Sequence, residues 1–230
     1  MDKAIQKKLL TVVKNNYQQI AYEFSLTRDK ALWPELLKLC ELVKENDNIL
    51  DVGCGNGRLW RALKNKNVKY TGIDNCSKLI QLAKKKYSND DVSFLIDDII
   101  SLNNVPNNNF NIIFCIAVLH HIPGKKLRIE ALQNLKKKLK KNGKIIITVW
   151  NLWQHPKHKN LIIKFALLKL LGKNKMDFGD IVFNWKGKKS SQRYYHAFTK
   201  KGLIELAKKT NLHIEKIYKD KYNYYLILTK

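Results

Sequence analysis

Cysteines are few in this sequence and indicate no covalent or metal framework. The 230 residues contain four of them, Cys40, Cys54, Cys76 and Cys115. They stand singly, with no CxxC pair and no histidine at ligand spacing, so the sequence predicts neither a disulfide framework nor a metal site. We expect four buried thiols.

Long hydrophobic runs are also lacking. No run approaches the roughly 18 apolar residues that a membrane-spanning helix needs, and the N-terminal stretch is charged from Asp2 onward. The sequence therefore predicts a cytoplasmic protein with no membrane partner. Its length favours a single domain over residues 1–230 that carries an insertion.

Acidic residues are scarce, and this shortage is the outlying feature of the composition. Lysine and arginine number 44 against 19 acidic residues, a formal net charge of +25 at pH 7. Such an excess predicts a phosphate-rich partner. Only five of the 44 are arginine, and a lysine-rich skew also arises from AT-rich coding, so the charge has two explanations. Coding bias accounts for lysine over arginine better than for the shortage of acids.

The middle of the chain alternates short apolar runs with helical patterns. Strand patterns occupy residues 48–52, 70–73, 92–96, 111–116 and 144–150, and helical patterns begin at Arg58 and cover residues 78–86 and 127–139. This rhythm predicts an α/β fold with a parallel sheet. We expect Gly143 to cap the last of these helices in a left-handed conformation. A helix over 200–210 and strands 214–218 and 224–229 follow, and their short connection makes them an antiparallel hairpin.

Two flanking segments depart from this rhythm. Residues 1–45 read as two helices separated by a polar and aromatic stretch over 17–33, with Pro34 opening the second helix. Residues 151–192 carry one amphipathic helix, over 161–171, and scattered aromatics, which is typical of an insertion or lid over the strand ends. The core then covers 46–150, and residues 193–230 form a C-terminal helix and hairpin.

A glycine-rich turn follows the first predicted strand. Gly53, Gly55 and Gly57 stand at alternate positions directly after Asp51 and Val52. Glycine permits backbone angles and close approaches that a β-carbon forbids. The spacing is GxGxG rather than GxGxxG, and the preceding acid is ill suited to an anionic diphosphate, so a cationic or neutral adenosyl ligand fits better. The alternative is a purely structural tight turn.

Acidic residues end the next two predicted strands. Asp74 lies 17 residues after Gly57, close to the spacing of an acid that accepts ribose hydroxyls. Asp97 and Asp98 follow the third strand, where a carboxylate can accept a hydrogen bond from an adenine amino group. Because the carboxyl ends of parallel strands form the ligand crevice in this architecture, these acids are expected to meet there.

The order of these motifs resembles class I S-adenosylmethionine-dependent methyltransferases. The resemblance covers about residues 46–150 and includes the segments 110–122 and 135–144, with Asn111 where the family usually has Asp. It implies a Rossmann-like, seven-stranded, mostly parallel sheet with an antiparallel final strand and helices on both faces. It also implies S-adenosyl-L-methionine as cofactor, with Asp98 on the adenine and Asp97 as its solvated neighbour. The implied cofactor-binding residues are Asp51, Gly53, Gly55, Gly57, Asp74, Asp98, Ile99 and Ile116.

A narrower resemblance lies in the flanking segments. Residues 17–28, Trp33-Pro34 and the run from Arg193 to His196 are similar to the eukaryotic tRNA wobble-uridine (5-carboxymethyluridine) methyltransferase family. This implies that a carboxymethyl group on tRNA is converted to its methyl ester. It also implies tRNA as partner and a small zinc-binding activator protein as a further possible one. The implied substrate-binding residues are Tyr17, Arg28, Trp33, Trp150, Arg193, Tyr194, Tyr195 and His196.

The chemistry of an ester-forming reaction limits what the site must contain. A carboxylate is already ionised at neutral pH, so no general base is needed and catalysis is mainly alignment. Arg28 or Arg193 can clamp the carboxylate. His120, His121 and His196, together with Arg193, are then expected to orient the substrate. His121 is equally well read as a core histidine.

Other functions stay open at the level of sequence. A methyltransferase for a small metabolite and a non-catalytic RNA- or protein-binding module of the same fold are the alternatives. Lysine clusters can track tRNA phosphates or can simply be solvated helix faces. The clusters comprise Lys84 to Lys86, residues 136–141, Lys188 and Lys189.

Overall fold

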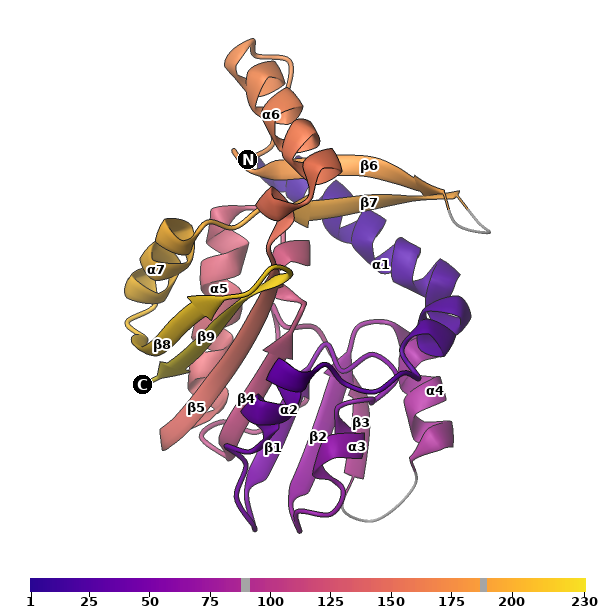
Figure 1. Ribbon diagram of the computed structural model, residues 1–230, viewed down its shortest axis with the longest axis vertical. Helices are drawn as coiled ribbons and strands as arrows, with labels where there is room; N and C mark the ends of the chain where they lie inside the picture. Colours follow the sequence, from indigo (N-terminus) through magenta and orange to yellow (C-terminus); the bar gives the residue numbers. More distant parts are fainter. Residues whose placement is uncertain (88–91, 187–189) are drawn as a thin grey trace.

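A seven-stranded sheet forms the centre of the molecule. The computed structural model describes residues 1–87, 92–186 and 190–230, and only the backbone of residues 185, 186, 190 and 191. The strand order is β3-β2-β1-β4-β5-β9-β8, with β9 antiparallel to both of its neighbours (Figure 1). The strands are β1 Asn48–Val52, β2 Lys69–Asp74, β3 Val92–Ile96, β4 Phe110–Ile116, β5 Leu139–Trp150, β8 His213–Lys219 and β9 Asn223–Thr229. The predicted α/β fold with its antiparallel final strand is confirmed.

Helices cover both faces of this sheet. Alternate residues of β1 face opposite sides, so Leu50 packs in a core with α5 and α7, whereas Ile49 packs in a second core with α2, α3 and α4. Both faces are therefore apolar, which explains the near-continuous hydrophobic strand patterns. The helices are α2 Pro34–Cys40, α3 Trp60–Leu63, α4 Ser77–Lys86, α5 Lys125–Lys138 and α7 Lys200–Lys209, and a short 3-10 turn, η1 Leu119–His121, follows β4. All four cysteines are buried and free, as expected.

The N-terminal helix is longer than predicted. Helix α1 runs from Lys3 to Thr27, so most of the stretch expected to be non-helical continues the helix. Tyr17, Ala21 and Phe24 lie on one face of it and pack against Cys76 and Leu79. Their spacing of three and four residues is helical. The stretch looked irregular because this buried stripe mixes aromatic residues with polar neighbours.

Gly143 does not cap a helix. Helix α5 ends at Lys138, and Gly143 lies inside β5 without a left-handed backbone conformation. A β-carbon on Gly143 would lie 2.8 Å from the backbone oxygen of Asn111, where the pairing of β4 with β5 shifts register. The glycine therefore permits a close strand approach. Asn111, the departure from the family pattern, accepts a hydrogen bond from the Asn48 backbone N–H at 3.0 Å, which is a structural role.

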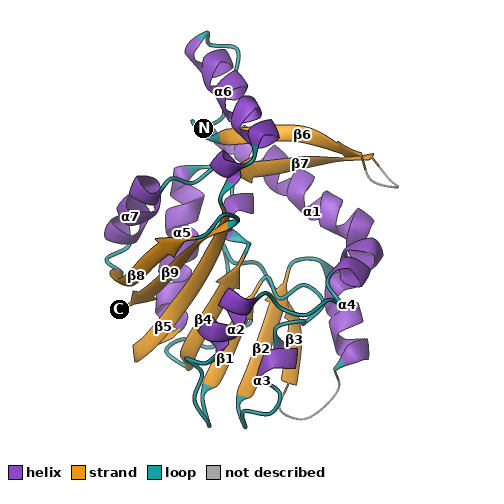
Figure 2. Ribbon diagram, viewed as in Figure 1, coloured by secondary structure: helices purple, strands orange, loops and turns teal. Residues whose placement is uncertain are grey.

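A separate hairpin stands above the carboxyl edge of the sheet. Strands β6 Asp180–Lys186 and β7 Ser190–His196 form their own two-stranded antiparallel sheet (Figure 2). Helix α6, Pro156–Leu170, projects beside them and begins five residues before its predicted start. The expected boundary between residues 192 and 193 lies inside β7. Helix α1 packs on β7 through Leu9 and Tyr194, so the N-terminal helix and the hairpin form one layer.

Among the helices of the described chain, none is both long and apolar enough to cross a bilayer.

Candidate active site

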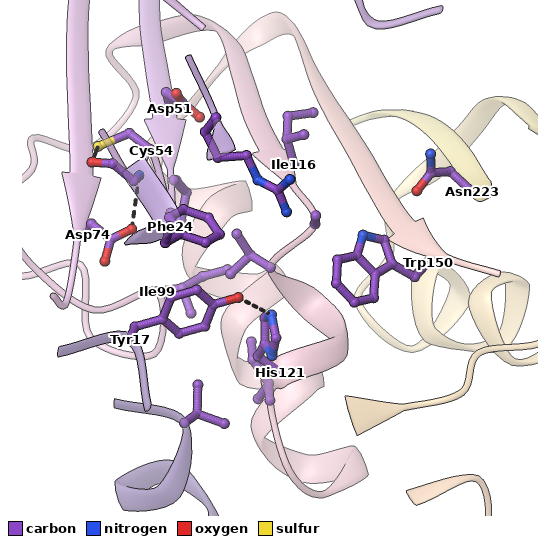
Figure 3. Close-up of a pocket in the computed structure, with 18 of the residues that line it drawn as sticks. Tyr17, Phe24, Asp51, Cys54, Asp74, Ile99, Ile116, His121, Trp150 and Asn223 are labelled. Carbon is purple, nitrogen blue, oxygen red and sulfur yellow. Dashed lines mark hydrogen bonds between the residues drawn. The ribbon is translucent and has the colours of Figure 1, made fainter. Parts of the chain in front are cut away.

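A large cavity opens between α1 and the carboxyl ends of β1, β2 and β4. Its volume is about 1110 Å³, and its wall includes the glycine-rich turn, residues 150–156 and the connection between β8 and β9 (Figure 3). Pockets that hold one small ligand commonly measure roughly 300 to 1,000 Å³. The cavity therefore has room for a nucleoside-sized ligand and part of a second molecule.

The glycine-rich turn has left-handed backbone angles, which its three glycines permit. Gly53, Gly55 and Gly57 all have positive φ, at +73°, +58° and +74°. A β-carbon on Gly53 would lie 2.2 Å from Cγ2 of Val118, so only glycine fits there. Gly53 and Gly55 line the cavity, whereas Gly57 lies against Phe94 and outside its wall.

Asp74 holds the glycine-rich turn against the end of β2. Its carboxylate accepts hydrogen bonds from the backbone N–H of Gly55 at 3.0 Å and of Cys76 at 2.8 Å. Burial raises the pKa of Asp74 to about 6, although these two hydrogen bonds lower it. The carboxylate faces the cavity, where a ligand hydroxyl can reach it (Figure 3).

Asp51 is a second buried acid at the end of β1. It accepts a hydrogen bond of 2.5 Å from the hydroxyl of Tyr70. Burial raises its pKa to about 7, and the Tyr70 hydrogen bond and the nearby Arg58 only partly offset this. A positively charged ligand in the cavity would therefore be attracted to Asp51 and would favour its ionised form.

The two acids after β3 differ in their surroundings, and only Asp97 departs from its expected place. Asp97 is only 8% exposed and accepts hydrogen bonds from the backbone N–H of Asp98 and Asn104, so its description as a solvated neighbour is wrong. It holds the loop in place. Asp98 accepts hydrogen bonds from Asn75 and from the backbone of Ile100, and it lines the cavity together with Ile99.

The end of β4 carries local strain beside the cavity. Ala117 has φ of +58°, which is uncommon for a residue with a side chain. The backbone N–H of Ala117 donates hydrogen bonds to the backbone oxygen of Thr148 at 3.0 Å and to its hydroxyl oxygen at 3.1 Å. Thr148 of β5 therefore holds Ala117 in this conformation. Ile116 and Ala117 both line the cavity. Strain of this kind gathers at functional sites because surrounding structure must hold it there.

Tyr17 and His121 form a hydrogen-bonded pair at the base of the cavity. The Tyr17 hydroxyl lies 2.9 Å from Nε2 of His121 (Figure 3). Burial lowers the pKa of His121 to about 4 and raises the pKa of Tyr17 above its usual range. A neutral imidazole therefore accepts the phenol hydrogen, which leaves the proton of the ring on Nδ1. The pair orients groups rather than transferring protons at neutral pH.

Two arginines line the cavity, and the guanidinium group of each lies over a different aromatic ring. The Arg28 guanidinium lies 4.9 Å from the ring centroid of Phe24, and that of Arg58 lies 5.3 Å from Trp33. Burial, together with the charge of Arg28, lowers the pKa of Arg58 to about 10. In the part of the chain that the structure describes, no acidic side chain forms an ion pair with either guanidinium. Sequence reasoning missed Arg58, although it directly follows Gly57.

The residues predicted from the hairpin lie behind the cavity. The buried carboxylate of Asp180 accepts a hydrogen bond of 2.8 Å from the Tyr194 hydroxyl and lies 2.6 Å from Nδ1 of His196. Arg193 and Tyr195 adjoin a small void behind Tyr17. These four residues therefore support the base of the cavity and do not form its wall, contrary to the expectation that they contact substrate.

The other predicted residues are divided between wall and core. Trp33 and Trp150 line the cavity. His120 is fully buried, with its ring centroid 4.9 Å from that of Trp150 and its pKa held low by burial, so it packs behind that wall. Among the described residues there is no group of three or more metal-ligating side chains placed to hold an ion.

Comparison with known proteins identifies related sequences and folds. The family model described as "Methyltransferase domain" matches residues 43–202. A tRNA (carboxymethyluridine(34)-5-O)-methyltransferase of Schizosaccharomyces pombe is 34% identical over 138 residues, which cover 60% of this chain and 57% of that protein. The chain thus spans little more than half the length of this relative.

Solved structures share the fold at lower sequence identity. A SAM-dependent methyltransferase from Methanosarcina mazei has a TM-score of 0.72 at 21% identity, covering 87% of this chain and 99% of that one. A chain of the complex between the Haloferax volcanii Trm112 methyltransferase activator and a putative methyltransferase has a TM-score of 0.67 at 15% identity, covering 94% and 96%. At these identities the likeness concerns the fold alone.

Proposed function

Because the chain belongs to the methyltransferase domain family, we propose that it uses S-adenosyl-L-methionine to form a methyl ester on the carboxymethyl group of a tRNA wobble uridine. One observation carries the proposal: a single cavity joins acids at the strand ends to two arginines that form no ion pair with the described acidic side chains. The acids suit a cationic cofactor, and the arginines suit a carboxylate substrate. The name of the Schizosaccharomyces pombe relative supports this substrate.

The residues at the acidic end of the cavity fit the cofactor. Asp74 offers a carboxylate to ribose hydroxyls, and Asp98 with the Ile99 backbone offers acceptor and donor groups to an adenine. Asp51 suits the positively charged end of the ligand. Gly53 and Gly55 line the cavity, so a ligand can lie along the backbone of this turn. When bound, S-adenosyl-L-methionine supplies an electrophilic methyl group.

The arginine end of the cavity fits an anionic substrate. Arg28 and Arg58 each present a planar guanidinium that can bind a carboxylate through two hydrogen bonds. Their aromatic supports, Phe24 and Trp33, hold them in place without neutralising them. A carboxylate bound there is already the nucleophile that ester formation requires. His121, whose pKa is about 4, has no proton-transfer step to perform at neutral pH.

Several lysines of the predicted clusters form bonds within the protein. Lys136, Lys138 and Lys140 donate hydrogen bonds to oxygen atoms of the protein itself. We therefore assign them a structural role rather than a role in phosphate binding. Lys86 pairs with Asp29. Lys188 and Lys189 lie outside the described residues. The overall charge of +25 still favours binding to a polyanion such as tRNA.

Partners and organisation complete the proposal. We propose that residues 1–230 form one methyltransferase domain in which α1 closes the cofactor site and the hairpin supports it. A small activator protein is a further proposed partner, and the fold shared with the chain of the Haloferax volcanii complex supports it.

The decisive test uses methyl-labelled S-adenosyl-L-methionine with the pure protein and tRNA that carries carboxymethyluridine. We expect label on the modified uridine that mild alkali releases, because esters hydrolyse readily. The matched control is tRNA with unmodified uridine at the same position, which offers no carboxylate and should stay unlabelled. Label that resists alkali would exclude an ester, and label found only in a small metabolite would replace tRNA as substrate. Cofactor binding without transfer to any acceptor would indicate a binding module.

A further inference from the structure

An exposed tyrosine stands at the rim of the cavity. Tyr222 lies in the connection between β8 and β9 and is 69% exposed, yet it belongs to the cavity wall with its neighbours Lys221 and Asn223. Asn223 begins β9 and faces the cavity beyond Trp150 (Figure 3). A large aromatic side chain in this position can contact a ligand that binds in the cavity.

The connection that carries Tyr222 is firmly held. One carboxylate oxygen of Asp220 accepts hydrogen bonds from the backbone N–H of Tyr222 at 2.7 Å and of Asn223 at 2.6 Å. Its other oxygen accepts the Tyr225 hydroxyl at 2.7 Å. The backbone N–H of Asn151 donates to the Tyr222 oxygen at 2.8 Å. The ring is thus presented by a preorganised turn, which lowers the entropic cost of binding through it.

Positive charge lies beside the ring and elsewhere on the cavity wall. The ammonium group of Lys221 lies 5.7 Å from the Tyr222 ring centroid. On α1, Lys7, Thr11 and Lys14 also line the cavity, and their spacing of four and three residues places them on one helix face. Neither helix lysine forms an ion pair within the described chain.

This combination matches the chemistry of single-stranded RNA. Proteins bind unpaired nucleotides through aromatic rings that stack on bases, with cations that follow the phosphates. An enzyme that draws one base into a cavity leaves its neighbours unstacked at the rim. A flat, exposed ring beside cations fits such a neighbour, whereas an acidic peptide would supply no flat surface for it.

We propose that Tyr222 stacks on the nucleobase next to the methylated nucleotide, while Lys221, Lys7 and Lys14 contact the flanking phosphates. This inference rests on the proposed function and adds a specific contact to it. The ring recognises the unpaired state of the loop, because every base has a stacking face. The enzyme would then select its target by an extruded nucleotide whose neighbouring base is free to stack, and not by the base sequence of the loop.

The experiment combines protein variants with altered RNA. The RNAs are anticodon stem-loops bearing the carboxymethyluridine, with an intact or an abasic nucleotide on its 5′ or 3′ side. We expect Tyr222→Ala to weaken binding of the intact stem-loop about 5- to 100-fold, and Tyr222→Phe to bind nearly as well as the wild type because it keeps the ring. One of the two abasic RNAs should bind the wild type equally weakly, and Tyr222→Ala should then weaken that complex little further.

The matched control is Tyr22→Ala. Tyr22 is 68% exposed on α1 but does not line the cavity, so its loss should leave RNA binding unchanged. Calorimetry with S-adenosyl-L-methionine should show unaltered cofactor affinity in every variant, since Tyr222 lies at the substrate rim.

The outcomes separate this inference from the proposed function. Equal losses from Tyr222→Ala on intact RNA and on both abasic RNAs would overturn the stacking contact while wild-type methyl transfer persists. An unchanged affinity of Tyr222→Ala for the intact stem-loop would do the same. Absence of wild-type transfer to any tRNA would instead overturn the function on which the inference rests.

Discussion

At the scale of single residues, two carboxyl groups, the buried Asp51 and the half-buried Asp74, set the electrostatics of the cavity. Asp51 and Asp74 have pKa values raised by burial to about 7 and about 6, because neither faces an ion-pair partner strong enough to offset the loss of water. Each keeps hydrogen bonds to the protein, from Tyr70 and from the backbone of Gly55 and Cys76. In the free protein they are partly protonated near neutral pH, and a bound cation favours their ionised forms.

These pKa values predict a pH-dependent cofactor affinity. Below pH values near 6 both groups hold protons that a cationic sulfonium ligand must displace, so affinity for S-adenosyl-L-methionine should rise as pH increases through about 6 and about 7. Titration calorimetry in buffers of different ionisation enthalpy should detect proton release on binding. Asp51→Asn should flatten the upper part of the dependence and Asp74→Asn the lower part. An affinity that stays constant over this range would contradict the assignment.

A neutral variant on the surface controls for overall charge. Glu130→Gln removes one exposed acid of α5 that is not part of the cavity wall, and it should leave the pH dependence as it is in the wild type. If it shifts the curve as much as Asp51→Asn, general electrostatics rather than local contact explains the effect.

At the scale of elements, α1 turns an open sheet edge into an enclosed cavity. The helix lies over the glycine-rich turn, with Phe24 3.5 Å from the position of a β-carbon on Gly55. Side-chain hydrogen bonds join it to the core between Tyr17 and His121, Gln18 and Ser77, and Asn56 and Ser25. The hairpin fills the space behind it, where Tyr195 and His121 have ring centroids 5.1 Å apart. Closure of the site is therefore a property of packed elements.

Tyr17→Phe tests the contact that joins α1 to η1. The change removes the hydroxyl that donates to Nε2 of His121 and leaves a buried imidazole nitrogen without its partner, so the free energy of unfolding should fall by about 1 to 3 kcal/mol. Urea unfolding followed by circular dichroism measures this. Tyr22→Phe is the control, since Tyr22 is exposed on the same helix and should unfold like the wild type. Identical midpoints for the two variants would show that the hydrogen bond does not hold α1.

At the scale of the whole molecule, charge is distributed unevenly with respect to the cavity. Lys136 and Lys138 of α5 donate to backbone oxygens, and Lys140 of β5 donates to the side-chain oxygen of Asn111. In contrast, Lys7, Lys14 and Lys221 line the cavity without ion-pair partners among the described residues. A polyanion approaching the mouth would meet the free charges first. Long-range attraction of this kind raises association rates and weakens with salt.

This distribution predicts how tRNA binding responds to salt. The logarithm of the association constant should fall linearly with the logarithm of salt concentration, by about 0.7 to 0.9 per phosphate contact. The double variant Lys7→Gln, Lys14→Gln should make that slope less steep by an amount equal to the loss of up to about two phosphate contacts. Lys208→Gln, Lys209→Gln on α7 removes two equally exposed charges remote from the mouth and should change the slope less. Equal slopes in both double variants would mean that binding reports net charge only.

Local sequence patterns were sufficient to predict which segments form the strands of the sheet and which residues lie at the acidic end of the cavity. Apolar runs bounded by glycine and acids specify β1 and β3 to the residue, and the same local pattern places Asp51, Gly53 and Asp74 at strand ends. These features are encoded within a few neighbouring residues, because a parallel sheet buries both faces and leaves its functional groups at one edge.

Tertiary packing, which local patterns do not encode, selects the distant side chains that reach the cavity. The run Arg193 to His196 lies behind the site because Asp180, on the partner strand, binds Tyr194 and His196. Arg58 lines the cavity with its guanidinium over the ring of Trp33. The backbone of Tyr222 is held at the rim of the cavity by hydrogen bonds with Asp220 and Asn151. Strand alternation within β7 cannot be assigned from sequence without knowing what packs on each face. Contacts between segments far apart in the chain settle that choice, because packing rather than local propensity selects the face that is buried.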